Sequence, residues 1–117
     1  MNDSAPWQPG EGETTGGTVW IDLCGIEEVS ADRGHLVLRD DRMMAVFRVD
    51  DSIRVLDDIC PHAGGSLSAG PLADGCVICP WHGWPFHLET GRCPDNPQIM
   101  VKTYPARVVE GRVRIKL

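Results

Sequence analysis

Two short segments that each join a cysteine to a histidine most constrain the fold of this chain. They are Cys60–His62 (CPH) and Cys79–His82 (CPWH), and sixteen residues separate His62 from Cys79. Ligands one or two residues apart fit a tight loop that presents both side chains to one metal centre, and the proline in each segment stiffens the loop. The chain must therefore bring two distant loops together, and we expect all four side chains to bind one metal centre.

The residue types alone leave other interpretations of these pairs open. Two cysteines and two histidines also bind structural zinc, although zinc-finger spacing usually puts Cys with Cys and His with His, whereas both pairs here are mixed. Another interpretation is coincidence between buried thiols and hydrogen-bonded histidines. Both mixed pairs are followed by a glycine within two residues, Gly64 and Gly83, and this repetition argues against coincidence. Together with the mixed pairing, which argues against zinc, it favours an iron–sulfur site.

Composition narrows the class of protein and the class of partner. The 117 residues fit one domain, and the net charge of −6 with a pI near 5.0 argues against nucleic acid or an anionic membrane as partner. The same charge favours a partner with a basic docking face. No apolar run approaches the length of a membrane span and the N-terminus lacks a signal-peptide pattern, so we expect a cytoplasmic protein. Five cysteines in a reducing compartment favour metal ligation over disulfides.

The hydrophobic pattern predicts an all-β domain, residues 18–117, behind a flexible polar tail, residues 1–17. Short apolar or alternating runs recur between turn residues, and no helical period is sustained, which is typical of an antiparallel sandwich or barrel. The range 26–31 could hold one helical turn. The predicted strands are Thr18–Leu23, His35–Arg39, Met43–Val49, Ile53–Asp57, Cys76–Cys79, Trp84–Leu88, Val101–Tyr104, Ala106–Val109 and Arg112–Lys116.

The range 59–97 differs from the rest of the chain. It holds most of the prolines, four of the five cysteines and three of the four histidines. We interpret it as a small functional subdomain on a β base, because loops that carry chemistry commonly sit on a rigid scaffold.

The two segments and their surroundings resemble the Rieske family. The likeness lies in CPHAGGSLSAGPL and CPWHGWPFHLETG and continues more loosely through TYPARVVEGRVRIKL. The resemblance implies an all-β Rieske fold and one [2Fe–2S] cluster, with Cys60 and Cys79 on one iron and His62 and His82 on the other. Two neutral imidazoles in place of two thiolates raise the reduction potential relative to an all-cysteine cluster.

Departures from the respiratory branch of that family indicate which kind of Rieske protein this is. That branch has a disulfide between positions that are Gly65 and Trp81 here, and a Ser and a Tyr at positions that are Trp84 and Phe86 here. The missing hydroxyl donors predict a potential closer to roughly −150 mV than to +300 mV.

The resemblance then implies a soluble carrier that passes single electrons from a flavin-type reductase to a terminal oxygenase or similar oxidoreductase. The alternative is the small subunit of an assimilatory NAD(P)H nitrite reductase, and a zinc-stabilised interaction module is a third class. We find no catalytic nucleophile or general base. Redox partners are expected to dock near Trp81 and an exposed edge formed by His62 and His82.

The remaining chemistry-bearing residues are assigned mostly to structure. We expect Cys24, Cys76 and Cys93 to be small apolar fillers, with Cys76 in the core and Cys93 partly exposed. His35 and His87 lie outside the motif. Trp81 is expected to be exposed and Phe86 to be core. The acidic pairs at 40–41, 50–51 and 57–58 are expected at solvated turns, with 57–58 the pair best placed for docking. Glycines at 64–65 and 83 are expected to allow positive φ or close approach of the backbone.

Overall fold

The computed structural model describes residues 14–15, 18–39, 41–50, 52–61, 64–81 and 83–116. Most of the predicted tail lies outside these ranges. Its residues Thr14–Thr15 form a short strand, β1, that pairs antiparallel with the start of β2. The strands and 3₁₀ helices in chain order are β1 (Thr14–Thr15), β2 (Thr18–Gly25), η1 (Ile26–Glu28), β3 (His35–Arg39), β4 (Arg42–Val49), β5 (Ser52–Asp57), η2 (Leu67–Ala69), β6 (Leu72–Ala73), β7 (Cys76–Ile78), β8 (Pro85–His87), β9 (Arg92–Cys93), β10 (Asn96–Met100), β11 (Thr103–Tyr104), β12 (Ala106–Val109) and β13 (Arg112–Lys116).

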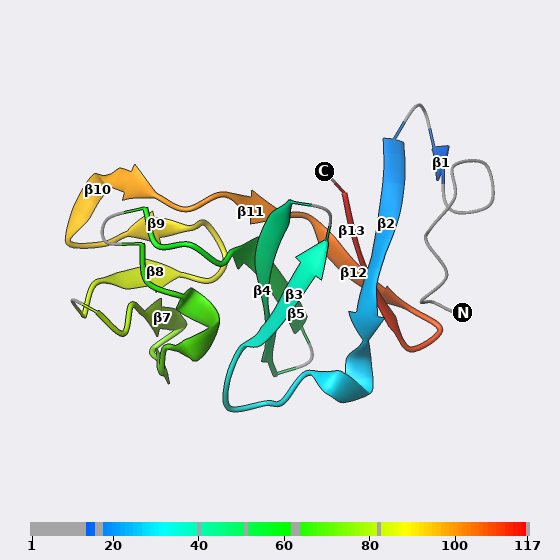
Figure 1. Ribbon diagram of the computed structural model, residues 1–117, viewed down its shortest axis with the longest axis horizontal. Helices are drawn as coiled ribbons and strands as arrows, with labels where there is room; N and C mark the ends of the chain where they lie inside the picture. The colour runs from blue at the N-terminus through cyan, green and yellow to red at the C-terminus, as the bar shows by residue number, and fades with distance from the viewer. Residues whose placement is uncertain are drawn as a thin grey trace.

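The base of the molecule consists of two antiparallel sheets. One runs in the order β1-β2-β13-β12, and the other, the central sheet, runs in the order β11-β5-β4-β3 (Figure 1). The hairpin between β12 and β13 turns at Glu110 and Gly111, whose φ values of 52° and 78° suit the tight turns that match strand twist. Asp50, in the turn between β4 and β5, also has a positive φ of 54°. Asp40 and Asp51 lie outside the described residues.

The central sheet is covered on both faces, because successive side chains of a strand point to opposite sides. Met44 and Val46 of β4 pack toward the first sheet, in a cluster with Val113 and Ile115. The next residues along β4, including Phe47, belong to a second cluster on the opposite face. We call the first cluster the base core and the second the loop-side core.

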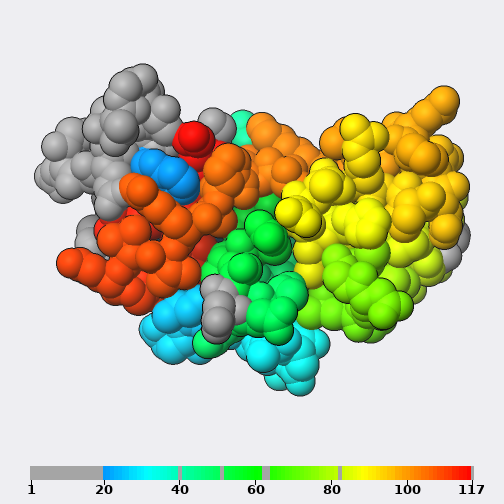
Figure 2. Space-filling model, turned by 180° about the vertical axis from the view of Figure 1, so that it is seen from behind, coloured from blue at the N-terminus to red at the C-terminus, as the bar shows by residue number. Residues whose placement is uncertain are grey.

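The loop-side core is closed by a small subdomain from the middle of the chain. Its strands form the short sheets β6-β7-β8 and β10-β9. Figure 1 places these strands together at one end of the molecule, and Figure 2 shows them from behind as one lobe against the base. Phe86 from β8 and Phe47 from the central sheet are both fully buried where the two parts meet. The prediction of an all-β fold with a subdomain on a β base is therefore confirmed, while the domain boundaries stay predictions.

Most predicted strands occur within a residue or two of their expected bounds. The two-residue strands β6 and β9 were not expected, and one longer stretch also differs. The strand expected over 101–104 is shorter, and the chain before it forms β10, which the sequence did not indicate because it contains Pro97. Between β10 and β11, the Val101 amide donates to the Gly91 carbonyl and the Lys102 carbonyl accepts from the Asp57 amide. These bonds lead the chain from the subdomain back to the central sheet. The helical turn expected within 26–31 is the 3₁₀ helix η1.

Candidate metal centre

Loop 1, residues 60–65, begins three residues after β5 ends. The Cys60 amide donates to the Gly65 carbonyl at 2.8 Å, and the Gly64 amide donates to the Cys60 carbonyl at 2.8 Å. Gly64 has a φ of +80°, a left-handed conformation that a side chain would strain. The loop is therefore closed on itself through both backbone groups of its cysteine.

Loop 2, residues 79–84, repeats this hydrogen-bond pattern. The Cys79 amide donates to the Trp84 carbonyl at 2.8 Å, and the Gly83 amide donates to the Cys79 carbonyl at 2.9 Å. Gly83 has a φ of +75°, close to that of Gly64. Two segments with different sequences thus form the same closed loop, each starting with its cysteine, and the prediction of positive φ at Gly64 and Gly83 is confirmed.

The two histidines of the predicted set, His62 and His82, lie outside the described residues. In the sequence His62 is the third residue of its loop and His82 is the fourth. Among the residues that the structure describes, no group of three or more His, Cys, Asp or Glu side chains gathers as a metal site would. The histidine ligands therefore stay a prediction, and the described half of the set is Cys60 and Cys79.

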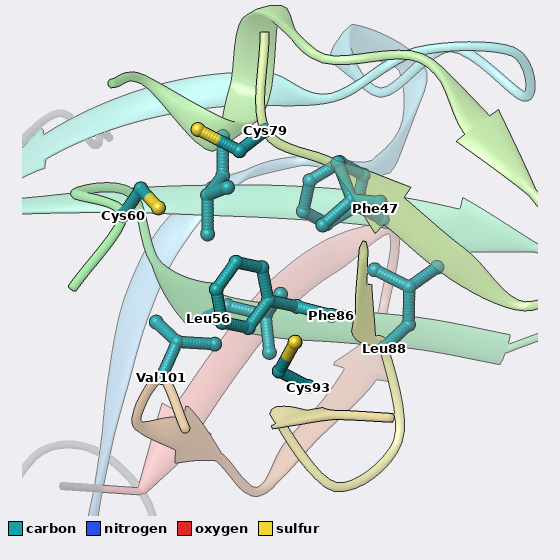
Figure 3. Close-up of a cluster of buried hydrophobic side chains, with 11 residues drawn as sticks. Phe47, Leu56, Cys60, Cys79, Phe86, Leu88, Cys93 and Val101 are labelled. Atoms are coloured by element: carbon teal, nitrogen blue, oxygen red, sulfur yellow. The ribbon is translucent and has the colours of Figure 1, made fainter. Parts of the chain in front are cut away.

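Cys60 and Cys79 lie at one end of the loop-side core. Each is 1% exposed, although both are in irregular loops. Figure 3 shows their sulfur atoms at the same end of the cluster, with Phe86 and Phe47 further along it. The fold thus brings the two predicted cysteines together in an apolar setting with little access for water.

The loops are joined at their bases by a close backbone approach. A Cβ atom on Gly70, which follows loop 1 and η2, would lie 2.0 Å from the carbonyl oxygen of Ile78, the residue before Cys79. The Ile78 amide in turn donates to the Pro71 carbonyl at 2.9 Å. Only glycine fits at position 70, and this contact fixes the exit of loop 1 against the entry of loop 2.

A second contact between the loops lies beside a cysteine sulfur. A Cβ atom on Gly65 would lie 3.1 Å from Trp81 Cγ and 3.2 Å from Cys79 Sγ. Positions 65 and 81 are therefore neighbours across the two loops. The glycine at 65 keeps the space next to the Cys79 sulfur open.

Asp58 anchors the start of loop 1 from inside the protein. Its carboxylate accepts from Ser66 Oγ at 2.5 Å and from the Ser68 amide at 2.7 Å, and the side chain is 0% exposed. The expectation that the 57–58 pair sits at a solvated turn and serves docking is therefore wrong for Asp58. A buried carboxylate is stable only where hydrogen bonds replace its hydration, and Ser66 and Ser68 supply them.

Asp57, the last residue of β5, is held by a side-chain network. The Tyr104 hydroxyl donates to Asp57 Oδ1 at 2.5 Å, and Arg42 Nη1 donates to the Tyr104 oxygen at 3.2 Å. Burial, and then the hydrogen bond to Asp57, raise the pKa of Tyr104, while Arg42 lowers it. The network ties the strand that leads into loop 1 to β11 and β4.

The other cysteines lie away from the two loops. Burial first, and then the carboxylate of Glu28, raise the pKa of the Cys24 thiol to about 12. Burial also raises the pKa of Cys76, whose sulfur lies 3.4 Å from Nδ1 of the exposed His87. Cys93 is 0% exposed, so the expectation of partial exposure is wrong, and Figure 3 shows it on the far side of Phe86 from Cys60 and Cys79. Raised pKa values keep the Cys24 and Cys76 thiols protonated and unreactive.

Two predictions about aromatic residues are confirmed. Trp81 is 65% exposed, whereas Phe86 is fully buried in the loop-side core. What the sequence did not reveal is the support beneath the loops, namely the Asp58 anchor and the close approach at Gly70. The sequence did hold one signal for the anchor. Asp58 lies two positions before Cys60, and Ser66 and Ser68 follow in the same segment, a pattern that fits a buried carboxylate bonded to serines as well as a solvated turn.

The described residues fit a small sulfur-rich metal cluster. Two thiols from matched loops converge at the end of an apolar core, and soft thiolate ligands suit iron–sulfur centres. Glycines at 64, 65 and 83 put no side-chain atom into the space around the loops. The donor set and the available space thus agree with the [2Fe–2S] cluster that the sequence predicts.

Comparisons with known proteins point the same way. The family model for the Rieske [2Fe-2S] domain matches residues 19–105. The anthranilate 1,2-dioxygenase ferredoxin subunit of Burkholderia cepacia is 33% identical over 100 residues, which cover 84% of this chain and 92% of that protein. A Mycobacterium tuberculosis structure described as the small subunit of an NADH-dependent nitrite reductase has a TM-score of 0.78 at 34% identity, covering 86% of this chain and 96% of that one.

A third similar structure is a chain from the complex of reduced oxygenase and oxidised ferredoxin in carbazole 1,9a-dioxygenase. Its TM-score is 0.75 at 29% identity, and the match covers 84% of this chain and 93% of that one. Within the described residues, no helix is long and apolar enough to span a membrane. The matched family model, the fold and the paired cysteine loops together show that this chain belongs to the Rieske [2Fe–2S] family and binds one such cluster.

Proposed function

We propose that this protein carries single electrons from a flavin-type reductase to a terminal oxygenase or a similar oxidoreductase. The observation that carries the proposal is the pair of matched loops that brings Cys60 and Cys79 together at the end of the loop-side core. The likeness of this chain to an oxygenase ferredoxin subunit extends over 92% of that subunit's length. A cytoplasmic location, expected from the sequence, is part of the same proposal.

Each predicted ligand has a distinct part in this function. Cys60 and Cys79 would hold one iron as thiolates, and His62 and His82 would hold the other as neutral imidazoles. When bound, the cluster supplies a one-electron redox couple. The loop-side core keeps water from the two sulfur atoms, and the closed loops hold the cysteines in place with little backbone freedom. Rigid ligands reduce the structural change that accompanies a change in charge.

The potential should lie near the low end of the Rieske range, closer to roughly −150 mV than to +300 mV. Phe86 is fully buried and has no hydroxyl to donate toward the cluster, and position 84 is an indole. Hydroxyl donors near a cluster stabilise its reduced form, so their absence lowers the potential.

Redox partners would dock near Trp81 and the edge formed by His62 and His82. Trp81 is 65% exposed beside loop 1, which supports the first half of this proposal. Exposed aromatic residues are common in the centres of interfaces. The two histidines lie outside the described residues, so their share of the surface rests on the sequence.

Metal analysis and a reconstituted electron-transfer assay test the proposal. We expect iron and sulfide in equal amounts, an EPR signal after dithionite reduction, and a negative midpoint potential by protein-film voltammetry. NADH with a flavin reductase should reduce the protein, and the reduced form should pass electrons to an oxygenase component. A colourless, zinc-containing and EPR-silent sample would reject the iron–sulfur assignment.

The structural match to a nitrite reductase small subunit favours one second function, that of a fixed subunit in such an enzyme. Affinity purification from the native organism separates the two. Stable recovery with a large subunit that reduces nitrite supports the second function. A protein recovered alone that still reduces an oxygenase component supports the carrier.

A further inference from the structure

Trp81 combines two properties that conflict for a large apolar side chain. It is 65% exposed, yet its ring approaches loop 1 closely at Gly65. An exposed indole has few packing contacts that would fix its position. A tryptophan that is exposed and also held against a neighbouring loop therefore requires a reason in the local geometry. That geometry involves the sulfur of Cys79.

Gly65 has both the ring and the sulfur on the side where a Cβ atom would lie. A methyl group there would meet Trp81 Cγ at 3.1 Å, Trp81 Cδ1 at 3.2 Å and Cys79 Sγ at 3.2 Å. All three distances are shorter than ordinary van der Waals contacts between heavy atoms. The backbone of loop 1, the indole and the thiol thus converge on one point, with glycine as the residue that allows it.

This contact differs from the others that hold the two loops. The hydrogen bonds at Cys60 and Cys79 close each loop on itself, and the close approach of Gly70 to Ile78 joins the loops at their bases. The contact between Gly65 and Trp81 joins them beside the sulfur. It comes from packing alone, so it holds the loops without a covalent bond or a charge.

We propose that Trp81 is a positioning residue for the cluster site, which packs on Gly65 to hold the two loops together and covers Cys79 Sγ from water. The inference rests on the proposed ligand role of Cys79 and adds a role for a residue that is not a ligand. Reduction adds negative charge at the site, and water stabilises that charge more than an indole does. Removal of the ring should therefore raise the midpoint potential and speed the loss of the cluster.

The test compares Trp81→Ala, Trp81→Phe and Gly65→Ala in the purified, cluster-loaded protein. The readouts are the rate of bleaching in the presence of an iron chelator and the midpoint potential. We expect Trp81→Ala to bleach about tenfold faster, in line with changes around other metal ligands, and to have a higher potential. Trp81→Phe should stay close to wild type. Gly65→Ala should change both readouts in the same direction as Trp81→Ala but by less, because its methyl group would push the ring and the Cys79 sulfur apart only slightly. Leu38→Ala, which removes another well-exposed apolar side chain, is the control and should change neither readout.

Several results would overturn the proposal. If Trp81→Ala bleaches at the wild-type rate with an unchanged potential, the ring does not position the site. If it only slows electron transfer to an oxygenase component, Trp81 is a docking residue alone. If it lowers the melting temperature of the protein without moving the potential, the residue is merely structural. Failure of the proposed function gives a different result, because the wild-type protein itself would then lack iron or fail to pass electrons to an oxygenase component.

Discussion

The two cores of this protein lie on opposite faces of one sheet and are completed in different ways. The base core is mostly aliphatic and lies between two antiparallel sheets, with Met44, Val46 and Ile115 fully buried. The loop-side core starts from the other side of the same strand but ends in two thiols, Cys60 and Cys79, on loops (Figure 3). One face is closed by the strands of the first sheet, and the other is closed by the subdomain, whose two cysteine loops lie at one end of the core.

The difference shows where this protein places rigidity and where it places chemistry. Regular hydrogen bonds between strands stabilise the base without any cofactor. In the two loops, glycines, hydrogen bonds within each loop and a buried carboxylate must replace the regular hydrogen bonds between strands. We therefore expect changes on the loop side to act on the cluster before they act on the fold.

The largest effect is expected from removal of a cluster thiolate. Cys60→Ser and Cys79→Ser should abolish bound iron, because a serine hydroxyl is a poor ligand for an iron–sulfur centre. The far-ultraviolet circular dichroism of the base sheets should persist. Iron analysis and visible absorption measure the first effect. Cys24→Ala changes the buried cysteine of the base core and is the control, which should keep its iron. Loss of iron in this variant would contradict the proposed difference between the two cores.

A methyl group at position 70 should give the next largest effect. Gly70→Ala places a Cβ atom 2.0 Å from the Ile78 carbonyl oxygen, so the backbone must shift at the base of both loops. We expect a loss of about 3 kcal/mol in unfolding free energy, the upper end for overpacked sites, measured by urea denaturation. Gly25→Ala, at the end of β2, is the comparison in the base, because its methyl group would meet Glu27 Oε2 at 2.4 Å, the end of a flexible side chain. An equal loss of unfolding free energy in both variants would contradict a specific role for the Gly70 contact.

A change at Asp58, the buried carboxylate beneath loop 1, should lower the free energy of unfolding by less than Gly70→Ala does. Asp58→Asn keeps the shape but weakens the acceptance of bonds from Ser66 and Ser68. We expect a loss of about 2 kcal/mol in unfolding free energy, together with faster loss of iron. Asp50→Asn makes the same change at an exposed turn, and asparagine tolerates the positive φ there. If both variants unfold alike, the buried anchor contributes nothing particular.

The smallest effect should come from the Tyr104 network at alkaline pH. Tyr104 is the single tyrosine of the chain, so absorbance near 295 nm follows its ionisation directly. Burial and the bond to Asp57 raise its pKa above the usual value of 10. Because the folded pKa is the higher one, its contribution to stability is complete below pH 10 and is lost as the pH rises through the folded pKa. Asp57→Asn should lower the observed pKa, and a pKa at or below 10 in wild type would refute the network.

Prediction from sequence succeeded where a residue's role depends on its neighbours in the chain. The strand His35–Arg39 and the hairpin at Glu110 and Gly111 follow from alternation and turn residues, and the structure has both. The roles of Asp58 and Cys93 were mistaken for the opposite reason. Each lies near glycine, proline or acidic residues that usually mark solvated turns, yet each is fully buried. Local sequence does not show which irregular segments the rest of the fold covers.

The sequence by itself determined the all-β class, the family and the positions of the paired cysteine and histidine segments, because strand period and ligand spacing are local properties. Only the tertiary structure decided that the two cysteine loops share one hydrogen-bond pattern and meet at the end of a core. It also decided that Gly65, Trp81 and Cys79 converge, and that Asp58 points inward. Those contacts join residues far apart in the chain or depend on burial, and burial is set by how the sheets and loops pack around them.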